Sequence, residues 1–398
     1  MLSLFLAFAA CENWAVIFTG SSGEYNYRHT ADSFYQYKLL IEGGIPKDHI
    51  ILMNFNDWPW SSANPFPGEI YRNLEHDPNI FPGNSSIDYM ERKVTEDNLF
   101  NVLKGNSSSG PVIKSTENDN VFLFYDDHGG DGILGVPDFC GGYIFAYELV
   151  ELFTYMHDNK LYKNLFFPIT ACYAGSTAKY LNDIPGLYIQ TASGEDESSY
   201  ATLYDSQLDE YLTSEYSLHK DEFIESNPTG TLAELFEYAK KYTEKSHVME
   251  YGDLSLRDMK VSDFVGNREP KPISKVSRTS EKVAEIYAKV TSLQKRSPNE
   301  TPLKRAEKNV RLAAERACEA RLNDIIGGLR KKFVPANCNI DFTKSCEKMN
   351  WPAYRKVLNA VHARVGVVGE SFFRKSFFFS NLCSIADADA IVADIQHL

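Results

Sequence analysis

Short apolar runs recur along the first half of the chain, and they constrain the fold more than any other feature. Each run is rich in aromatic and β-branched residues, which is typical of a strand buried on both faces. The five runs cover residues 14–20, 50–55, 121–125, 165–169 and 187–191. Helical patterns separate most of them. This alternation predicts βαβ units and an α/β fold, a mostly parallel sheet flanked by helices.

The chain changes character near residue 267. Four prolines and many Ser, Lys and Arg residues over 267–302 indicate a linker, with one short amphipathic piece at 281–293. Apolar residues at helical spacing then predict a small all-α domain over 303–398, with helices at 303–333, 351–365, 370–383 and 386–395. With a leader at 1–11, the α/β domain is expected to cover residues 12–266.

Composition excludes several classes of protein. Of the 398 residues, 43% are hydrophobic and the net charge is −13, which argues against disorder and against nucleic acid as a partner.

Charge is unevenly distributed along the chain, because Asn267–Arg316 holds 13 Lys/Arg against 6 Asp/Glu. A basic linker can therefore dock on an acidic body. The apolar stretch Met1–Ala10 predicts a secretory signal peptide, and it is far shorter than the roughly 20 residues of a membrane anchor.

Two chemically reactive side chains follow two of the predicted strands. His128 comes shortly after the strand 121–125 and precedes two glycines, and Cys172 follows the strand 165–169. Carboxyl ends of neighbouring parallel strands meet at one edge of a sheet, so a thiol and an imidazole should face one crevice. That pair suits a cysteine nucleophile and its general base. The backbone N–H groups of Gly129 and Cys172 are candidates for an oxyanion hole.

Five segments around these residues strengthen the interpretation. They are Tyr25-Asn-Tyr-Arg-His29, Tyr125-Asp-Asp-His128-Gly-Gly, Ala171-Cys172-Tyr-Ala-Gly-Ser176, Glu197-Ser-Ser-Tyr-Ala201 and Ser246-His-Val-Met-Glu-Tyr-Gly252. With these segments in this order, the chain resembles the legumain family of asparaginyl endopeptidases, cysteine proteases of the caspase-like clan, over about residues 13–265. The resemblance implies a caspase-like fold, a thioester acyl-enzyme, cleavage after Asn and no cofactor or metal.

The resemblance also assigns roles residue by residue. Cys172 corresponds to the nucleophile, His128 to the general base and Asn26 to the residue that supports the histidine. Asp127 corresponds to the aspartate that can become a succinimide linked to ligase activity. Arg28 and His29 match the basic side of the primary specificity pocket, and Ser198 and Ser199 match its substrate-binding wall.

The pocket departs from the family at two positions. Thr170 stands where the family has a glutamate, and Ser214 where it has an aspartate. An asparagine side chain offers both a donor and an acceptor, so it needs an acid as well as an arginine. We therefore expect a pocket less strict for Asn that leans towards Asp. Asp205, Asp209 or Glu215 are candidates to supply the missing carboxylate.

The family's regulation extends to the tail. The helical tail resembles the legumain prodomain, which implies an intramolecular inhibitor released by acid, with Asn299 as a candidate self-processing site. Of the tail's cysteines, Cys346–Cys383 is the expected disulfide, and Cys338 is left with Cys318 or unpaired. The expected partners are protein and peptide substrates and cystatin-type inhibitors. The expected compartment is on the secretory route, either acidic and lysosome- or vacuole-like, or extracellular.

Three alternatives remain at this stage. A transamidase or peptide ligase would share the acyl-enzyme and differ in whether an amine or water attacks it. The related catalytic subunit of the glycosylphosphatidylinositol transamidase should carry a C-terminal membrane helix. A non-catalytic relative that binds peptides is the third, although Cys172, His128 and Asn26 are all present.

Overall fold

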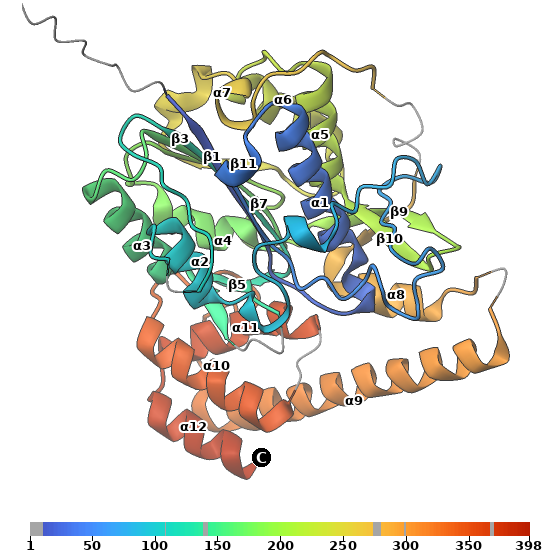
Figure 1. Ribbon diagram of the computed structural model, residues 1–398. Helices are drawn as coiled ribbons and strands as arrows, with labels where there is room; N and C mark the ends of the chain where they lie inside the picture. The colour runs from blue at the N-terminus through green and yellow to red at the C-terminus, as the bar shows by residue number, and fades with distance from the viewer. Residues whose placement is uncertain (1–10, 108, 138–141, 274–279, 298–299, 367–369) are drawn as a thin grey trace, which may run out of the picture.

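A six-stranded sheet forms the centre of the computed structural model, which describes residues 11–107, 109–137, 142–273, 280–297, 300–366 and 370–398 (Figure 1). The strand order is β11-β8-β7-β3-β1-β2, and only β11 is antiparallel to its neighbour. The strands are β1 (Asn13–Thr19), β2 (Ile50–Met53), β3 (Asn120–Asp126), β7 (Asn164–Thr170), β8 (Leu187–Thr191) and β11 (Met249–Gly252). The predicted α/β class with a mostly parallel sheet is confirmed. The antiparallel edge strand β11 was not predicted, because it is short and mostly half-exposed.

Helices cover both faces of this sheet. Alternate residues of β1 point to opposite sides, so Val16 packs in one core and Ile17 in the other. The first core includes α2 (Glu96–Leu103) and α3 (Ala146–Asp158). The second includes α1 (Tyr27–Glu42), α5 (Glu215–Ser226), α6 (Leu232–Tyr242) and α7 (Ser262–Val265). Both faces of the central strands are therefore buried, as their continuous apolar sequence predicts.

Helix α1 begins within the Tyr25–His29 motif. Its first turn contains Tyr27, Arg28 and His29, all buried. The apolar residues at helical spacing, Phe34, Tyr37 and Ile41, mark only the part of the helix that follows this turn. The position of the first turn matters for the site, since it places two basic side chains inside the protein at the edge of the sheet.

Two small sheets stand at the edge where β3 and β7 end. One is β4 (Gly129–Gly130), β5 (Ile133–Gly135) and β6 (Tyr143–Phe145); the other has the order β10-β9-β12 and combines β9 (Tyr200–Asp205), β10 (Glu210–Ser214) and β12 (Lys282–Ala284). Strand β12 comes from the predicted linker. That segment therefore forms β12, a 3₁₀ turn at Glu285–Tyr287 and helix α8 (Ala288–Gln294).

The C-terminal helices lie below the sheet's carboxyl edge, in orange and red in Figure 1. They are α9 (Pro302–Phe333), α10 (Trp351–Val365), α11 (Ser371–Cys383) and α12 (Ala388–His397). All four were predicted within a few residues. They share one apolar core with Ile133, Tyr143 and Phe145 of the β4–β6 sheet, so the helical region packs directly against the body.

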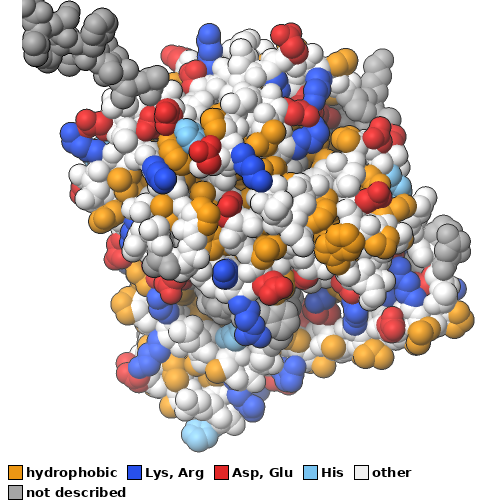
Figure 2. Space-filling view, in the orientation of Figure 1, with side chains coloured by type: hydrophobic (Ala, Val, Ile, Leu, Met, Phe, Trp, Pro, Cys, Tyr) orange, Lys and Arg blue, Asp and Glu red, His pale blue; other side chains and the backbone are white. Residues whose placement is uncertain are grey.

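Charged side chains of both signs lie along the line where the C-terminal helices meet the body (Figure 2). Arg311 pairs with Glu24, and Lys308 pairs with Asp209. These contacts agree with the expectation that the basic segment docks on the acidic body. The domain boundaries themselves stay predictions.

Candidate active site

The ends of β3 and β7 bring the two predicted reactive residues to neighbouring loops. The strands are parallel with Tyr125 opposite Ile169 and Asp126 opposite Thr170, and the chains continue to His128 and Cys172. A Cβ atom placed on Gly129 would lie 2.3 Å from the carbonyl oxygen of Cys172. Only glycine allows the two loops to approach so closely.

Asn26 fixes the orientation of the His128 ring. The side-chain nitrogen of Asn26 donates to the Ser22 carbonyl at 2.9 Å, so its oxygen Oδ1 faces Nε2 of His128 at 3.1 Å. That oxygen can only accept, which assigns the proton to Nε2. His128 Nδ1 is buried without a hydrogen-bond partner, and it is the nitrogen left free to accept a proton.

Cys172 is fully buried and lies against Ser199. Its Sγ is 3.4 Å from the Ser199 hydroxyl and 3.9 Å from the Ser199 carbonyl oxygen. Burial, and then the nearby carboxylate of Glu285, raise the pKa of the thiol to about 12. Burial also holds the pKa of His128 well below its ordinary value, helped by the charges of His29 and Arg28. In this state thiol and imidazole are both neutral.

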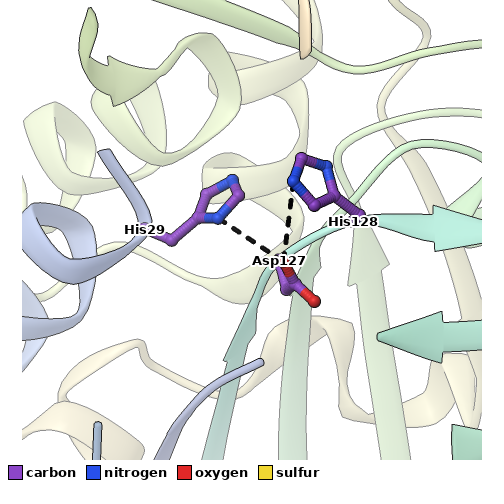
Figure 3. A group of neighbouring side chains, drawn as sticks. All are labelled: His29, Asp127 and His128. Atoms are coloured by element: carbon purple, nitrogen blue, oxygen red, sulfur yellow. Dashed lines mark ion pairs between the residues drawn. The ribbon is translucent and has the colours of Figure 1, made fainter. Parts of the chain in front are cut away.

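A second histidine and an aspartate stand beside His128 (Figure 3). Asp127 Oδ1 lies 3.5 Å from His29 Nδ1 and 3.9 Å from His128 Nε2, and candidate ligand atoms of all three residues fall within 4.8 Å of one another. His29 Nδ1 also lies 2.8 Å from the Ser21 hydroxyl. The two ring nitrogens that face Asp127 also have oxygen partners, the Ser21 hydroxyl for His29 and the Asn26 side chain for His128. The arrangement places Asp127, the candidate succinimide residue, within the catalytic cluster.

Arg28 is the cationic centre of the predicted specificity pocket. Its side chain is buried, one guanidinium nitrogen donates to the Tyr25 carbonyl at 3.0 Å, and Nε and the other terminal nitrogen have no hydrogen-bond partner. Burial opposes the charge, but the carboxylates of Glu285, Glu370 and Asp126 raise the pKa of Arg28. The pocket therefore holds a permanent cation with unused donors.

Neither of the two positions that depart from the family, Thr170 and Ser214, presents a charged group to Arg28. Thr170 shares a 2.8 Å hydrogen bond with Ser217, and the backbone N–H of Ser214 donates to Asp32 at 2.9 Å. Both residues are fully buried.

The three carboxylates suggested as replacements are engaged elsewhere, which corrects that part of the prediction. Asp205 lies 2.6 Å from His76, Asp209 pairs with Lys308, and Glu215 pairs with Lys282 at 2.5 Å. The electrostatic partners of Arg28 are instead Asp126, Glu210, Glu285 and Glu370. Sequence reasoning missed them, because Glu285 and Glu370 belong to the predicted linker and tail, and Asp126 and Glu210 sit inside strands. Burial raises the pKa of both Asp126 and Glu210 well above the ordinary range.

Helix α11 covers the catalytic cluster. The ring of Phe373 lies 5.6 Å from the His128 ring, and the ring of Phe377 lies 4.8 Å from Tyr173, next to Cys172. Glu370, just before the helix, places Oε1 3.5 Å from His128 Nε2. The helical tail therefore supplies side chains to the catalytic centre itself.

Comparison with known proteins identifies the family. Residues 13–267 match the model of the peptidase C13 family. The chain belongs to the peptidase C13 family.

Among relatives, this C13 chain is 37% identical to mouse (Mus musculus) legumain over 273 residues, which is 66% of this chain and 62% of that protein. It is 36% identical to the vacuolar-processing enzyme of Citrus sinensis, over 64% of this chain and 54% of that protein. The chain thus spans less than two thirds of the relatives' length in these matches. Caspase-1 from Spodoptera frugiperda aligns at 10% identity with a TM-score of 0.39, over 66% of this chain and 92% of that chain.

The remaining predictions for this C13 chain have mixed outcomes. The predicted Cys346–Cys383 disulfide is absent, since both are free thiols, as is Cys338. Burial raises the pKa of Cys383 to about 12, with a contribution from Cys346, so both remain protonated neighbours. The predicted signal peptide and Asn299 lie outside the described residues. Across the described ranges, the helices are all too short or too polar to cross a bilayer.

Proposed function

We propose that this C13 chain is a cysteine endopeptidase held in a latent form by its own C-terminal region. The observation that carries the proposal is the Cys172–His128 arrangement at the two strand ends, with Asn26 fixing the imidazole so that Nδ1 stays free. Membership of a peptidase family supports the reaction class.

Each group has a defined part in the reaction. His128 Nδ1 takes the proton of the Cys172 thiol, and the sulfur attacks the carbonyl carbon of the scissile bond. The negative charge on the carbonyl oxygen is stabilised by the N–H groups of Gly129 and Cys172. The intermediate collapses to a thioester as the C–N bond breaks, and His128 returns the proton to the leaving amine. Water then hydrolyses the thioester and regenerates the thiol.

The specificity pocket is built on Arg28 and His29, with Ser198 and Ser199 lining the approach. Arg28 offers donors to an oxygen of the substrate side chain, which suits Asn or Asp. A peptide ligase would use the same thioester and a substrate amine in place of water. The names of the legumain and vacuolar-processing enzyme relatives support an acidic, lysosome- or vacuole-like compartment.

Latency follows from the covered cleft. The thiol of Cys172 has a pKa of about 12 while the segment from 280 to 297 and helix α11 cover it, so almost none is thiolate at neutral pH. Uncovering the thiol restores solvent and removes the Glu285 carboxylate, which lowers that pKa. Protein substrates reach the nucleophile only after this step.

The test uses the full chain, activated by acid, and denatured casein as substrate. Wild-type protein should release peptides, and Cys172→Ala should lose activity by about a thousandfold or more while keeping its melting temperature. Cys338→Ala, which removes a half-buried thiol of the helical tail, is the matched control and should stay active. Casein cleavage by Cys172→Ala at the wild-type rate would sink the mechanism. A peptide with a free amino terminus, added during the assay, detects ligation in the same experiment, because a ligase would join it to the cleaved fragment.

A further inference from the structure

Strand β12 is bound to the edge of the body as an added strand. It pairs antiparallel with β9, with Lys282 opposite Thr202, Val283 opposite Ala201 and Ala284 opposite Tyr200. The pairing continues past the strand, because the N–H of Glu285 donates to the Ser199 carbonyl at 3.0 Å. A peptide that adds a strand to a sheet edge gains affinity from its main chain and specificity from the pockets that take its side chains.

This added strand ends beside the nucleophile. Ala284 and Ile286, which flank Glu285, pack in the same small cluster as Cys172 and Tyr173. The Ser199 carbonyl that receives the Glu285 N–H is also the one 3.9 Å from Cys172 Sγ. The register therefore sets Glu285 next to the reacting sulfur, where the residue before a scissile bond belongs.

The Glu285 side chain enters the basic pocket. It is fully buried, its Oε2 lies 3.8 Å from His29 Nε2, and it is the carboxylate that acts most strongly on Arg28. Neither carboxylate oxygen has a hydrogen-bond partner, and two guanidinium nitrogens of Arg28 are likewise without one. A buried charge without a counter-charge is costly, so burying Glu285 and Arg28 together costs less free energy than burying either one alone.

We propose that Glu285 is a built-in occupant of the primary specificity pocket and that the pocket prefers a glutamate side chain in substrates. The inference deepens the function proposed above and rests on it. Glutamate fits because an acid needs only donors, which Arg28 and His29 supply. Asparagine also needs an acceptor for its amide, and Thr170 and Ser214 stand at the two positions where the family supplies it with an acid.

Glu285 occupies the pocket, but the peptide bond that follows it is a poor substrate. The reason is the conformation of its backbone. Its carbonyl oxygen accepts the N–H of Ala288, which begins helix α8. A carbonyl committed to a helical turn is not presented to the N–H groups of Gly129 and Cys172. The segment thus inhibits by occupying the pocket while its peptide bond stays protected.

A substrate panel tests the preference. The probes are Lys-Val-Ala-Xaa peptides with a fluorogenic amide, where Xaa is Glu, Gln, Asp or Asn, offered to the activated full-length enzyme. Glu and Gln have the same shape, so their comparison isolates the charge. We expect kcat/KM for Glu to exceed that for Gln by about tenfold or more, because charge-assisted hydrogen bonds are roughly twice as strong as neutral ones. Equal or faster cleavage after Gln or Asn overturns the proposal.

The same assay separates the two proposals. Casein cleaved in a Cys172-dependent way, with no preference for Glu, contradicts the glutamate pocket and leaves the endopeptidase intact. Casein left uncut contradicts the endopeptidase, and pocket occupancy is then decided by a readout that needs no turnover.

That readout is alkylation of Cys172 by iodoacetamide in the intact chain, followed by mass spectrometry of its peptide. Glu285→Gln should be alkylated about tenfold faster than wild type, because losing the negative charge that acts on Arg28 loosens the segment over the thiol. Glu269→Gln, an exposed acid in the same connecting segment, is the matched control and should react as wild type does. Equal rates for Glu285→Gln and wild type overturn the proposal. If Glu285→Gln fails to fold, Glu285→Asp, shorter by one methylene, is measured in its place with the same two outcomes.

Discussion

Glu370 of the C-terminal region lies 3.5 Å from Nε2 of the catalytic-site residue His128, inside the body of the protein. Lys289 of helix α8 lines the same cavity as His128 and Glu370, so the segment carrying Glu285 and the approach to helix α11 meet at one point. Glu285 and Glu370, which belong to the covering elements, thus both act on Arg28. Whether the cleft stays covered should therefore depend on pH.

Replacing Glu370 by Gln should make the stability of the covered state less dependent on pH. Burial raises the pKa of Glu370 to about 7, although Arg28 and Lys289 oppose the shift, against an ordinary value of 4.5. The covered form therefore binds a proton more tightly, which stabilises it fully below pH 4.5, and this contribution is lost as the pH rises through about 7. Relative to Glu370→Gln, wild type should lose about 1 to 3 kcal/mol of unfolding free energy between pH 4.5 and 8. Urea unfolding at both pH values measures it, and parallel pH curves for the two proteins would contradict the prediction.

Protonation of Glu370 stabilises the covered form at low pH, so this residue opposes release of the cover by acid. Acid loosening has to come from carboxylates whose pKa is lowered, such as Glu244, which is held down by its hydrogen bond to Lys282. The stabilisation from such a pair is present above the ordinary pKa and is lost only as the pH falls through the lowered value. Activation near pH 4 is therefore expected to outpace activation near pH 6. Glu370→Gln, which mimics the protonated acid, should leave activation near pH 4 unchanged and keep the cleft covered above pH 7.

Sequence alone predicted the part of the site that local patterns encode. Cys172 and His128 follow continuous apolar strands, and parallel pairing forces their loops together. It could not predict that Glu285 and Glu370 enter the pocket, because nothing in a proline-rich linker or a helical tail shows which body residue it contacts. Strands β9 and β10 were missed for a related reason. They are short and carry polar residues, since their function is to form a pocket and an edge rather than the core.

Asn26→Leu should lower kcat more than it raises KM. Without the oxygen 3.1 Å from Nε2, nothing fixes the proton on that nitrogen, and His128 loses the orientation that leaves Nδ1 free. We expect kcat to fall by about tenfold to a hundredfold, measured with the best peptide of the panel. Asn26→Asp, which keeps an acceptor oxygen at the same place, should recover part of the loss. Equal damage by both substitutions would show that Asn26 acts on the loop rather than on the imidazole.

Lys282→Met should release strand β12. Lys282 Nζ lies 2.5 Å from the fully buried Glu215 and 2.9 Å from Glu244, so its loss leaves a buried carboxylate without its cation. Unfolding free energy should fall by about 1 to 3 kcal/mol, and alkylation of Cys172 should speed up. Lys295→Met, which removes a cation paired with the exposed Glu281, is the matched control and should cost under about 1 kcal/mol. Similar losses from both variants would contradict a specific role for Lys282.

Asp131→Ala should detach the C-terminal helices from the body. Asp131 is fully buried and accepts hydrogen bonds from the Ser345 hydroxyl at 2.5 Å, the Cys346 N–H at 2.9 Å and the Ser380 hydroxyl at 2.5 Å. All three donors belong to the tail, and removing the carboxylate takes away the one acceptor that they share and leaves a cavity at the interface. We expect a loss of about 2 to 4 kcal/mol in urea unfolding, together with faster alkylation of Cys172.

The control for this anchor is Asp196→Ala. Asp196 also binds the tail, accepting from the Ser345 N–H at 2.7 Å and pairing with Lys344 at 3.1 Å, but it does so in solvent. Water replaces those contacts when they are lost, so the cost should stay under about 1 kcal/mol and Cys172 should remain protected. If Asp196→Ala exposed Cys172 as much as Asp131→Ala does, the exposed charged contacts at the edge of the interface would be what holds the tail. The buried anchor beside His128 would then not be what keeps the cleft covered.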